Sequence, residues 1–162
     1  MQQSPDKIGK YLIDHQLTIS VAESVTAGCL QTRLSILKDA RLFFQGGITV
    51  YNCGQKARHL NIEPIYALKC NAVDLSITIK MAHEVCRLFC SEVGVSTTGY
   101  AAPLPEEHIG TPFSYYAIVY KNKLIASGKL TAVSTCYGLE VQQEFAERVL
   151  EVLAQELIRE QE

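Results

Sequence analysis

The chain has 162 residues, a net charge of −2 and a hydrophobic fraction of 48%. This length and apolar content fit one domain with a sizeable core and exclude a disordered chain. The 15 Lys and Arg residues do not outnumber the 17 Asp and Glu residues. The chain therefore lacks the basic surplus with which proteins hold nucleic acid, and we expect a small-molecule partner instead.

The N-terminal residues lack a charged region followed by an apolar one, and no segment reaches the roughly 18 uninterrupted apolar residues of a membrane span. We therefore expect a cytoplasmic protein with no membrane partner. The cysteines form no CxxC pair, which excludes a zinc ribbon or a thioredoxin-type motif and predicts free thiols. They are Cys29, Cys53, Cys70, Cys86, Cys90 and Cys136.

Hydrophobic periodicity predicts an alternation of helices and strands, followed by a late hairpin. The first half is expected to begin with a helix that has its N-cap at Ser4, Pro5 at its first position and its end near 15–16. A strand over 17–22 should follow, and then a helix with Leu30, Leu34 and Leu37 on its apolar face. Next come a strand over 43–51 and a helix over 52–60 that Pro64 stops. The second half is expected to contain a helix over 74–92, a strand over 93–98, a loop over 99–112, strands over 114–120 and 124–133, and a helix over 138–160.

This order predicts a single domain over residues 1–162 with an α/β fold: three layers, α/β/α, around a mixed sheet of about five strands. Gly46 and Gly47 interrupt the second strand. Paired glycines in a strand indicate a bulge or a close approach of another segment.

Ligands of open α/β sheets bind at the carboxyl ends of the strands, where the N–H groups of the following helices point outward. Three segments follow a predicted strand in this way, namely Ser24–Gly28, Tyr51–Lys56 and Thr98–Pro103. We expect these three segments to form the site.

The second segment predicts a specific chemistry. Asn52 and Gln55 have capping-box spacing, which makes Tyr51 and Lys56 the two neighbouring positions of a hydrophobic staple. The helix dipole and partial burial both disfavour a charged amine there, so we expect Lys56 to be neutral. A neutral amine beside a phenol can act as general base for a hydroxyl nucleophile, and Ser24 supplies such a hydroxyl.

A purely structural interpretation of these residues remains open. In it Ser24 and Thr26 are helix N-caps, Tyr51 is a strand-end aromatic residue and Lys56 is a solvated surface side chain. A metal site is a further alternative, because the His83, Cys86 and Cys90 side chains would share one face of a helix. For these three we favour core packing and expect no metal.

The chain resembles the CinA C-terminal domain family from about Ile8 to Leu157. The resemblance rests on four segments that occur in order and at family spacing: Ala22–Gly28 (family pattern AESxTxG), Phe44–Asn52 followed by Lys56, Asn71–Asp74 with Met81 and Ala82, and Thr98–Pro103. It implies a three-layer α/β fold and hydrolysis of the carboxamide of nicotinamide mononucleotide to nicotinate mononucleotide and ammonia, without a cofactor or a metal. The family's catalytic serine, tyrosine and lysine fall on Ser24, Tyr51 and Lys56.

In the expected mechanism, Ser24 Oγ attacks the amide carbon while Lys56, aided by Tyr51, takes the proton and later delivers one to ammonia. Backbone N–H groups near Gly28 or around Gly47 hold the oxyanion, and the Thr98–Gly99 loop holds the ribose phosphate. The expected substrate-binding positions are Thr26, Gly28, Gly47, Thr98, Gly99 and Ala101.

The chain departs from the family where a phosphate would be held. The family patterns AGPxGG, KPVGTV and GDRxxxR are replaced by residues 101–106, 111–116 and 132–138, which lack glycines, a lysine and an arginine, and Arg41 replaces a family serine. Such losses weaken phosphate binding. Arg33, Lys38 and Arg41 are candidates to replace the missing charge.

Three functions are therefore compatible with the sequence: an amidohydrolase of nicotinamide mononucleotide or a related nucleotide amide, a catalytically impaired member that binds a nucleotide or a partner, and a structural homo-oligomer. The family and the apolar helix faces indicate a homo-oligomer. Because one domain fills the 162 residues, we expect the additional N-terminal domain of many CinA proteins to be absent.

Overall fold

The computed structural model describes the backbone of residues 3–160 and the side chains of residues 6–160. Its centre is a five-stranded sheet with the order β2-β1-β3-β4-β5. The strands are β1 (Ile19–Glu23), β2 (Phe44–Thr49), β3 (Val93–Tyr100), β4 (Phe113–Tyr120) and β5 (Lys123–Thr131). Strands β1, β2 and β3 run parallel to one another, and β4 is antiparallel to both of its neighbours, β3 and β5. This confirms the predicted mixed sheet.

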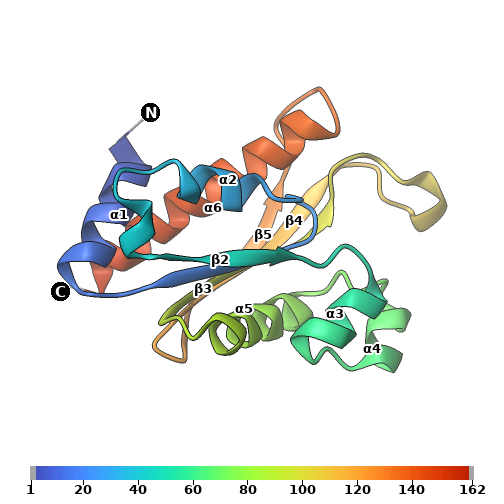
Figure 1. Ribbon diagram of the computed structural model, residues 1–162. Coiled ribbons are helices and arrows are strands. Elements are labelled where there is room, and N and C mark those ends of the chain that lie inside the picture. Colours follow the sequence, from blue (N-terminus) through green and yellow to red (C-terminus); the bar gives the residue numbers. More distant parts are fainter. Residues whose placement is uncertain (1–2, 161–162) are drawn as a thin grey trace.

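Helices cover both faces of the sheet, which confirms the three layers (Figure 1). They are α1 (Gln3–Asp14), α2 (Cys29–Ser35), α3 (Cys53–Leu60), α4 (Pro64–Lys69), α5 (Leu75–Phe89) and α6 (Leu139–Arg159), with short 3-10 turns η1 (Ala40–Leu42) and η2 (Pro105–Glu107). One apolar core joins α1, α2 and α6 to the sheet, and another joins α3, α4 and α5. Within the described part of the chain, no helix is both long and apolar enough to cross a membrane.

The helices depart from the prediction at the start of α1, after α3 and at the end of α5, which stops at Phe89 and not near residue 92. Helix α1 already includes Ser4, so this residue is not the N-cap, and its side chain lies outside the described residues. Pro64 does not merely stop α3 but opens α4, which the sequence reading missed. The Glu63 carboxylate caps that helix by accepting from the N–H groups of Ile65 and Tyr66. The signal was available, because proline is favoured in the first turn of a helix.

The two glycines of β2 have the predicted roles. The register shifts between the pairs Ile19–Phe44 and Ser20–Gly46, which marks a bulge, and Gly46 has a φ of 130°. A Cβ on Gly47 would lie 2.6 Å from Val21 Cγ2, too close for a side chain. The bulge and the close approach are both confirmed.

Strand β3 is two residues longer than predicted, because it pairs with β4 as far as Tyr100 and Phe113. Gly99 and Tyr100 therefore lie in a strand and not in the predicted loop. A Cβ on Gly99 would lie 2.0 Å from the Phe113 carbonyl oxygen, so the close pairing of these strands requires glycine there. The carboxyl ends of β1, β2 and β3 meet at one edge of the sheet.

Candidate functional site

The three segments that were expected to form the site come together at this edge, around a cavity of about 420 Å³. Each segment contributes to the walls: Ser24 and Val25 after β1, Tyr51, Asn52 and Lys56 after β2, and residues 99–104 at the end of β3. The parallel arrangement of these strands brings the segments together, as the topology rule predicts.

Two further segments line the cavity, and the sequence reading did not assign them to it. Asn71 and Val73 come from the connection between α4 and α5, and Gly138 and Gln142 come from the start of α6. Asn71 Nδ2 donates to the Tyr100 hydroxyl at 3.2 Å. Asn71 belonged to a family segment, but nothing in its local pattern indicated the cavity.

Ser24 sits in a tight turn directly after β1, with 5% of its surface exposed. Its N–H donates to the Thr97 carbonyl at 3.1 Å, which fixes the turn to β3. The neighbouring side chain of Glu23 is fully buried, and its carboxylate accepts from the N–H groups of Gly28, Leu30 and Gln31 at 3.0, 3.0 and 2.8 Å. Glu23 thus occupies the N-terminus of α2 and holds the turn that carries Ser24.

Thr26 belongs to the same buried network. Its hydroxyl donates to Glu23 Oε2 at 2.5 Å and contacts Thr97 Oγ1 at 2.8 Å. The N-cap of α2 is Gly28, which has no side chain. The interpretation of Ser24 and Thr26 as N-caps is therefore wrong, because the Glu23 carboxylate takes the helix N–H groups instead.

Lys56 is buried, with only 1% of its surface exposed. Its Nζ donates to Thr98 Oγ1 at 3.1 Å and to the Ala72 carbonyl at 3.3 Å. Burial disfavours the charged amine and lowers the pKa of Lys56 from 10.5 to about 8. Burial thus lowers the pKa of Lys56 in the expected direction, although not far enough to make the amine mostly neutral at pH 7, and the interpretation of Lys56 as a solvated surface residue is wrong.

The backbone that receives Lys56 is unusual. Asn71 and Ala72 both have positive φ values, of 51° and 54°, a conformation that is uncommon for residues other than glycine. Thr98 Oγ1 also donates to the Ala72 carbonyl, at 3.2 Å. The left-handed turn thus presents one carbonyl to both Lys56 and Thr98, a type of backbone strain that gathers at functional sites.

Tyr51 lies at the mouth of the cavity, with 69% of its surface exposed. The next residue, Asn52, caps α3 by accepting from Gln55 N–H at 3.0 Å, as predicted. The Gln55 side chain contacts His59 Nε2 at 3.1 Å, so only one half of the capping box forms. Tyr51 and Lys56 share the cavity, Tyr51 at its rim and Lys56 in its buried wall.

The expected substrate-binding positions divide into two groups. Gly99 and Ala101 line the cavity, and Thr98 holds Lys56. Thr26 and Gly28 serve the Glu23 network, and Gly47 packs between β1 and α2, so these three lie outside the cavity walls. Because Gly28 N–H already donates to Glu23, it is not free to hold an oxyanion.

A sequence model of the CinA C-terminal domain matches residues 1–157 of the chain. The chain belongs to the CinA family. A competence-damage inducible protein of Clostridium novyi is 32% identical over 154 residues, which are 94% of this chain and 36% of that protein. Another, of Desulforamulus reducens, is 35% identical over 111 residues, 68% of this chain and 27% of that protein. The chain thus spans about a third of the length of these curated relatives.

Solved CinA structures share the fold. A CinA superfamily protein of Klebsiella pneumoniae superposes with a TM-score of 0.86 and 18% identity over 97% of both chains. A competence or damage-inducible protein of Enterobacter asburiae superposes with a TM-score of 0.83 and 22% identity over 96% of both chains. At these identities the likeness concerns the fold alone.

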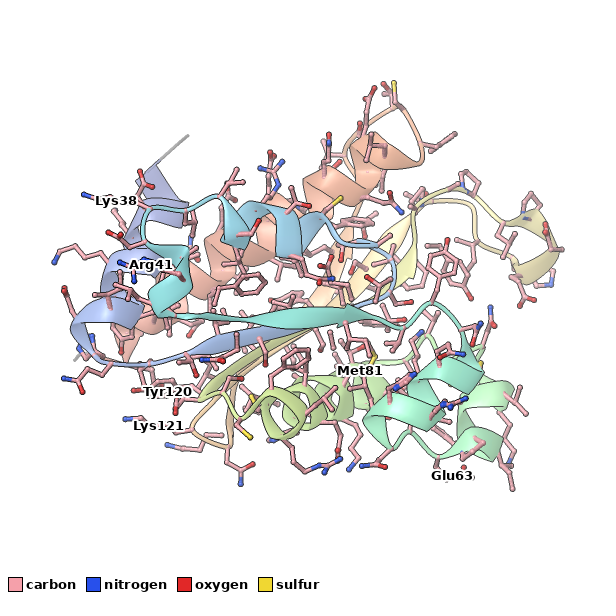
Figure 2. All side chains as sticks on the ribbon, in the orientation of Figure 1. Lys38, Arg41, Glu63, Met81, Tyr120 and Lys121 are labelled. Carbon is pink, nitrogen blue, oxygen red and sulfur yellow. The ribbon has the colours of Figure 1, made fainter. Side chains whose placement is uncertain are left out.

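The basic residues expected to replace the family's missing charges do not reach the cavity. Arg33 on α2 pairs with Glu147 on α6 at 2.5 Å. Lys38 lies just before η1 and Arg41 lies within it, before the amino end of β2 and on the side of the molecule away from α3 and α4 (Figure 2). The expectation is therefore wrong. Among residues 3–160, Lys56 is the one charged side chain that lines the cavity of this CinA domain.

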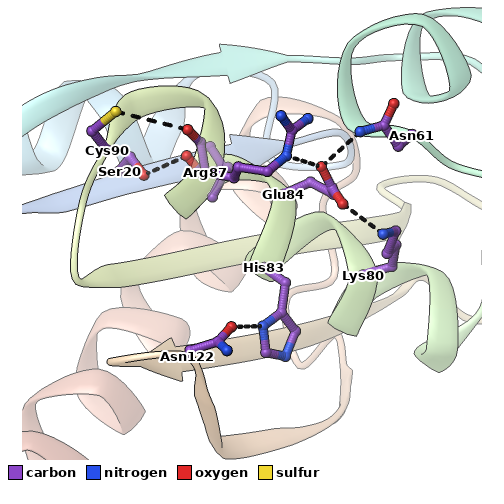
Figure 3. A network of polar contacts seen from close by, with 9 residues as sticks. Ser20, Asn61, Lys80, His83, Glu84, Arg87, Cys90 and Asn122 are labelled. Carbon is purple, nitrogen blue, oxygen red and sulfur yellow. Dashed lines mark hydrogen bonds and ion pairs between the residues drawn. The ribbon is translucent and has the colours of Figure 1, made fainter.

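His83 on α5 and Cys90 at its C-cap point in different directions (Figure 3). Cys86 packs against Ala82, Ala117 and Val119, and burial raises the pKa of its thiol to about 11. Cys90 is exposed at the end of the helix, against the expectation of core packing, and His83 Nδ1 contacts Asn122 Oδ1 at 3.3 Å. The described residues contain no cluster of three or more His, Cys, Asp or Glu side chains that could hold a metal.

Proposed function

We propose that this CinA domain is an amidohydrolase that converts nicotinamide mononucleotide, or a related nucleotide amide, to the acid and ammonia. One observation carries the proposal: a serine hydroxyl and a buried lysine with a pKa of about 8 line the same cavity. A base is most effective when its pKa lies near the working pH, and a lysine at its ordinary pKa of 10.5 would be almost fully protonated there.

In the proposed reaction Ser24 Oγ attacks the amide carbon, and Lys56, whose Nζ hydrogen-bonds Thr98 and Ala72 and not Ser24, takes the hydroxyl proton through one water. The tetrahedral intermediate then collapses and the C–N bond breaks, while Lys56 returns the proton to the departing ammonia. Water adds to the acyl-serine ester in the second half, which releases the acid and restores the Ser24 hydroxyl. The balance is amide plus water to acid plus ammonia.

The surrounding residues are assigned by their places in the cavity. Thr98 and the Ala72 carbonyl hold the Lys56 amine in position. Val25 follows the nucleophile and lines the cavity, so its N–H is our candidate oxyanion donor in place of Gly28. Tyr51, at the cavity mouth, is our candidate to aid the proton transfer through Lys56, and its exposed ring could also close over the nicotinamide ring.

The test is ammonia release from nicotinamide mononucleotide by the purified chain, with Ser24→Ala and Lys56→Met as matched variants. The wild type should release ammonia well above both variants. An equal background rate in wild type and Ser24→Ala would contradict the proposal for this substrate.

A second candidate function is a binding module without turnover, acting on a nucleotide or a partner. The observation that favours it is the loss of the family's basic residues, because Lys56 is the one charged side chain in the described cavity walls. A thermal-shift series with mononucleotides tests it. Ligand at a hundredfold excess over Kd should stabilise the fold by about 2.7 kcal/mol, with no ammonia released.

A further inference from the structure

The cavity is poor in the groups that hold a phosphate. A phosphate monoester carries nearly two negative charges at neutral pH, and proteins hold it with Arg, Lys or free N–H groups at a helix N-terminus. In the part of the chain that the structure describes, Lys56 is the one cation in the cavity walls. It is 1% exposed and already donates to Thr98 and Ala72. A buried amine with two acceptors is not a clamp for a dianion.

Three of the helix N-termini near the cavity, those of α2, α3 and α5, are occupied by the protein's own side chains. Glu23 fills the start of α2, where a strand–turn–helix unit would otherwise receive a phosphate. Asn52 caps α3, and Asp74 caps α5 by accepting from Ser76 N–H at 2.8 Å. The two carboxylates would also repel a phosphate.

The start of α6 also lines the cavity, and its N-cap Gly138 provides no side chain. The first turn of this helix carries Glu140, whose carboxylate raises the pKa of the Cys136 thiol. The positive end of the helix dipole stabilises a carboxylate at this position, and the carboxylate then repels a second anion there. The start of α6 therefore offers the cavity backbone N–H groups alone, without a basic side chain and with Glu140 opposing an anion.

The groups that do line the cavity suit a ligand with hydroxyls, a carboxamide and an aromatic ring. Asn71, Asn52 and Gln142 provide neutral amides, and the described cavity walls contain no carboxylate. Tyr100 contributes an aromatic ring whose hydroxyl is held by Asn71 Nδ2 at 3.2 Å. The pyridinium ring of a nicotinamide nucleoside is cationic, and aromatic faces attract cations. A cationic ring near Lys56 would also favour the neutral amine that the reaction needs.

We infer that the cavity takes a nucleoside amide without a phosphate in preference to a mononucleotide. This inference rests on the proposed amidohydrolase function and names its substrate class. The amide would be hydrolysed as proposed above. The ribose end of the substrate, which carries the phosphate in a mononucleotide, would meet neutral groups.

The test compares kcat/KM for nicotinamide riboside and for nicotinamide mononucleotide, measured as ammonia release at one pH with Ser24→Ala as the blank. We expect at least about a tenfold preference for the riboside, the order of one charged hydrogen bond. An equal or greater value for the mononucleotide would overturn the inference and leave the proposed function standing. If neither substrate exceeds the blank, the proposed function fails and the inference fails with it.

A pair of variants tests the physical cause. Gln142→Arg adds a cation to the cavity wall, and Gln155→Arg makes the same change at an exposed position of α6 outside the cavity. Gln142→Arg should shift the preference toward the mononucleotide by about tenfold, whereas Gln155→Arg should leave the ratio unchanged. An equal shift in both variants would show that overall charge sets the ratio, which contradicts the inference. Thermal unfolding confirms that both variants fold.

Discussion

The Nζ atom of Lys56 lies 3.1 Å from the Oγ1 atom of Thr98, although 42 positions separate the two residues in the chain. Both side chains are buried, at 1% and 0% exposure. The contact joins the helix after β2 to the end of β3 and places an amine in the wall of the cavity. Changes to this contact should alter the pKa of Lys56 and the pH dependence of the activity.

The activity should rise with pH through the pKa of Lys56. Burial lowers that pKa to about 8, and the neutral amine is the active form in the proposed reaction. We expect kcat/KM for amide hydrolysis to rise about tenfold per pH unit below this value and to reach a plateau above it. A profile that is flat from pH 6 to 9 would rule out Lys56 as the base.

Thr98→Val should move that profile. The Thr98 hydroxyl accepts from Nζ and so favours the charged amine, and its removal should lower the pKa of Lys56 further. The acidic limb of the profile should shift to lower pH, while kcat falls because the amine has lost a positioning partner. Thr131→Val, the same change at an exposed residue of β5, is the control. Identical profiles for the two variants would contradict this role of Thr98.

The stability of the fold should increase between pH 8 and 10.5 because of Lys56. Its pKa is about 8 in the folded chain against 10.5 ordinarily, so in this window the unfolded chain binds more protons than the folded one. The free energy of unfolding therefore rises with pH here, by up to about 3 kcal/mol, and the burial penalty is fully present below pH 8. Urea unfolding of wild type and Lys56→Met at several pH values checks this, since the variant should lack the rise. Parallel curves would disprove it.

Glu23→Gln should destabilise the chain and loosen the turn that carries Ser24. The buried carboxylate accepts four hydrogen bonds, and an amide would present its NH₂ group to some of these donors. We expect a loss of about 2–4 kcal/mol in unfolding free energy, measured by urea denaturation. Glu107→Gln, at an exposed carboxylate of η2, should have no measurable effect. Equal stabilities of the two variants would refute the structural role of Glu23.

Gly47→Ala should strain the contact between β2, β1 and α2. The new Cβ would lie 2.6 Å from Val21 Cγ2 and 2.7 Å from Gln31 Cγ. We expect a loss of about 1–3 kcal/mol, as is typical of overpacking. At Gly110 a Cβ meets nothing within 4 Å, so Gly110→Ala is the matched control and should be close to neutral in thermal unfolding.

The sequence by itself determined the features that depend on neighbours a few residues away. Alternating and helical periodicity located the five strands and all the helices except α4. The Asn52 cap and the bulge at Gly46 follow from interactions within one turn or one strand pair. The order of strands and helices also predicted that the three candidate segments would meet, because parallel strands end at the same edge.

Only the tertiary structure decided which polar side chains are buried and which groups they contact. The same local pattern allowed Lys56 to be solvated or buried, and its burial depends on Thr98 and Ala72 from distant segments. The Glu23 carboxylate reaches the N-terminus of α2 because the turn after β1 brings the N–H groups of Gly28, Leu30 and Gln31 back to it. Arg41 is close to β2 in sequence but lies at the amino end of that strand, whereas the cavity lies at the carboxyl end. Charge and hydrogen bonding act through space, so residues far apart along the chain set the chemistry of the cavity.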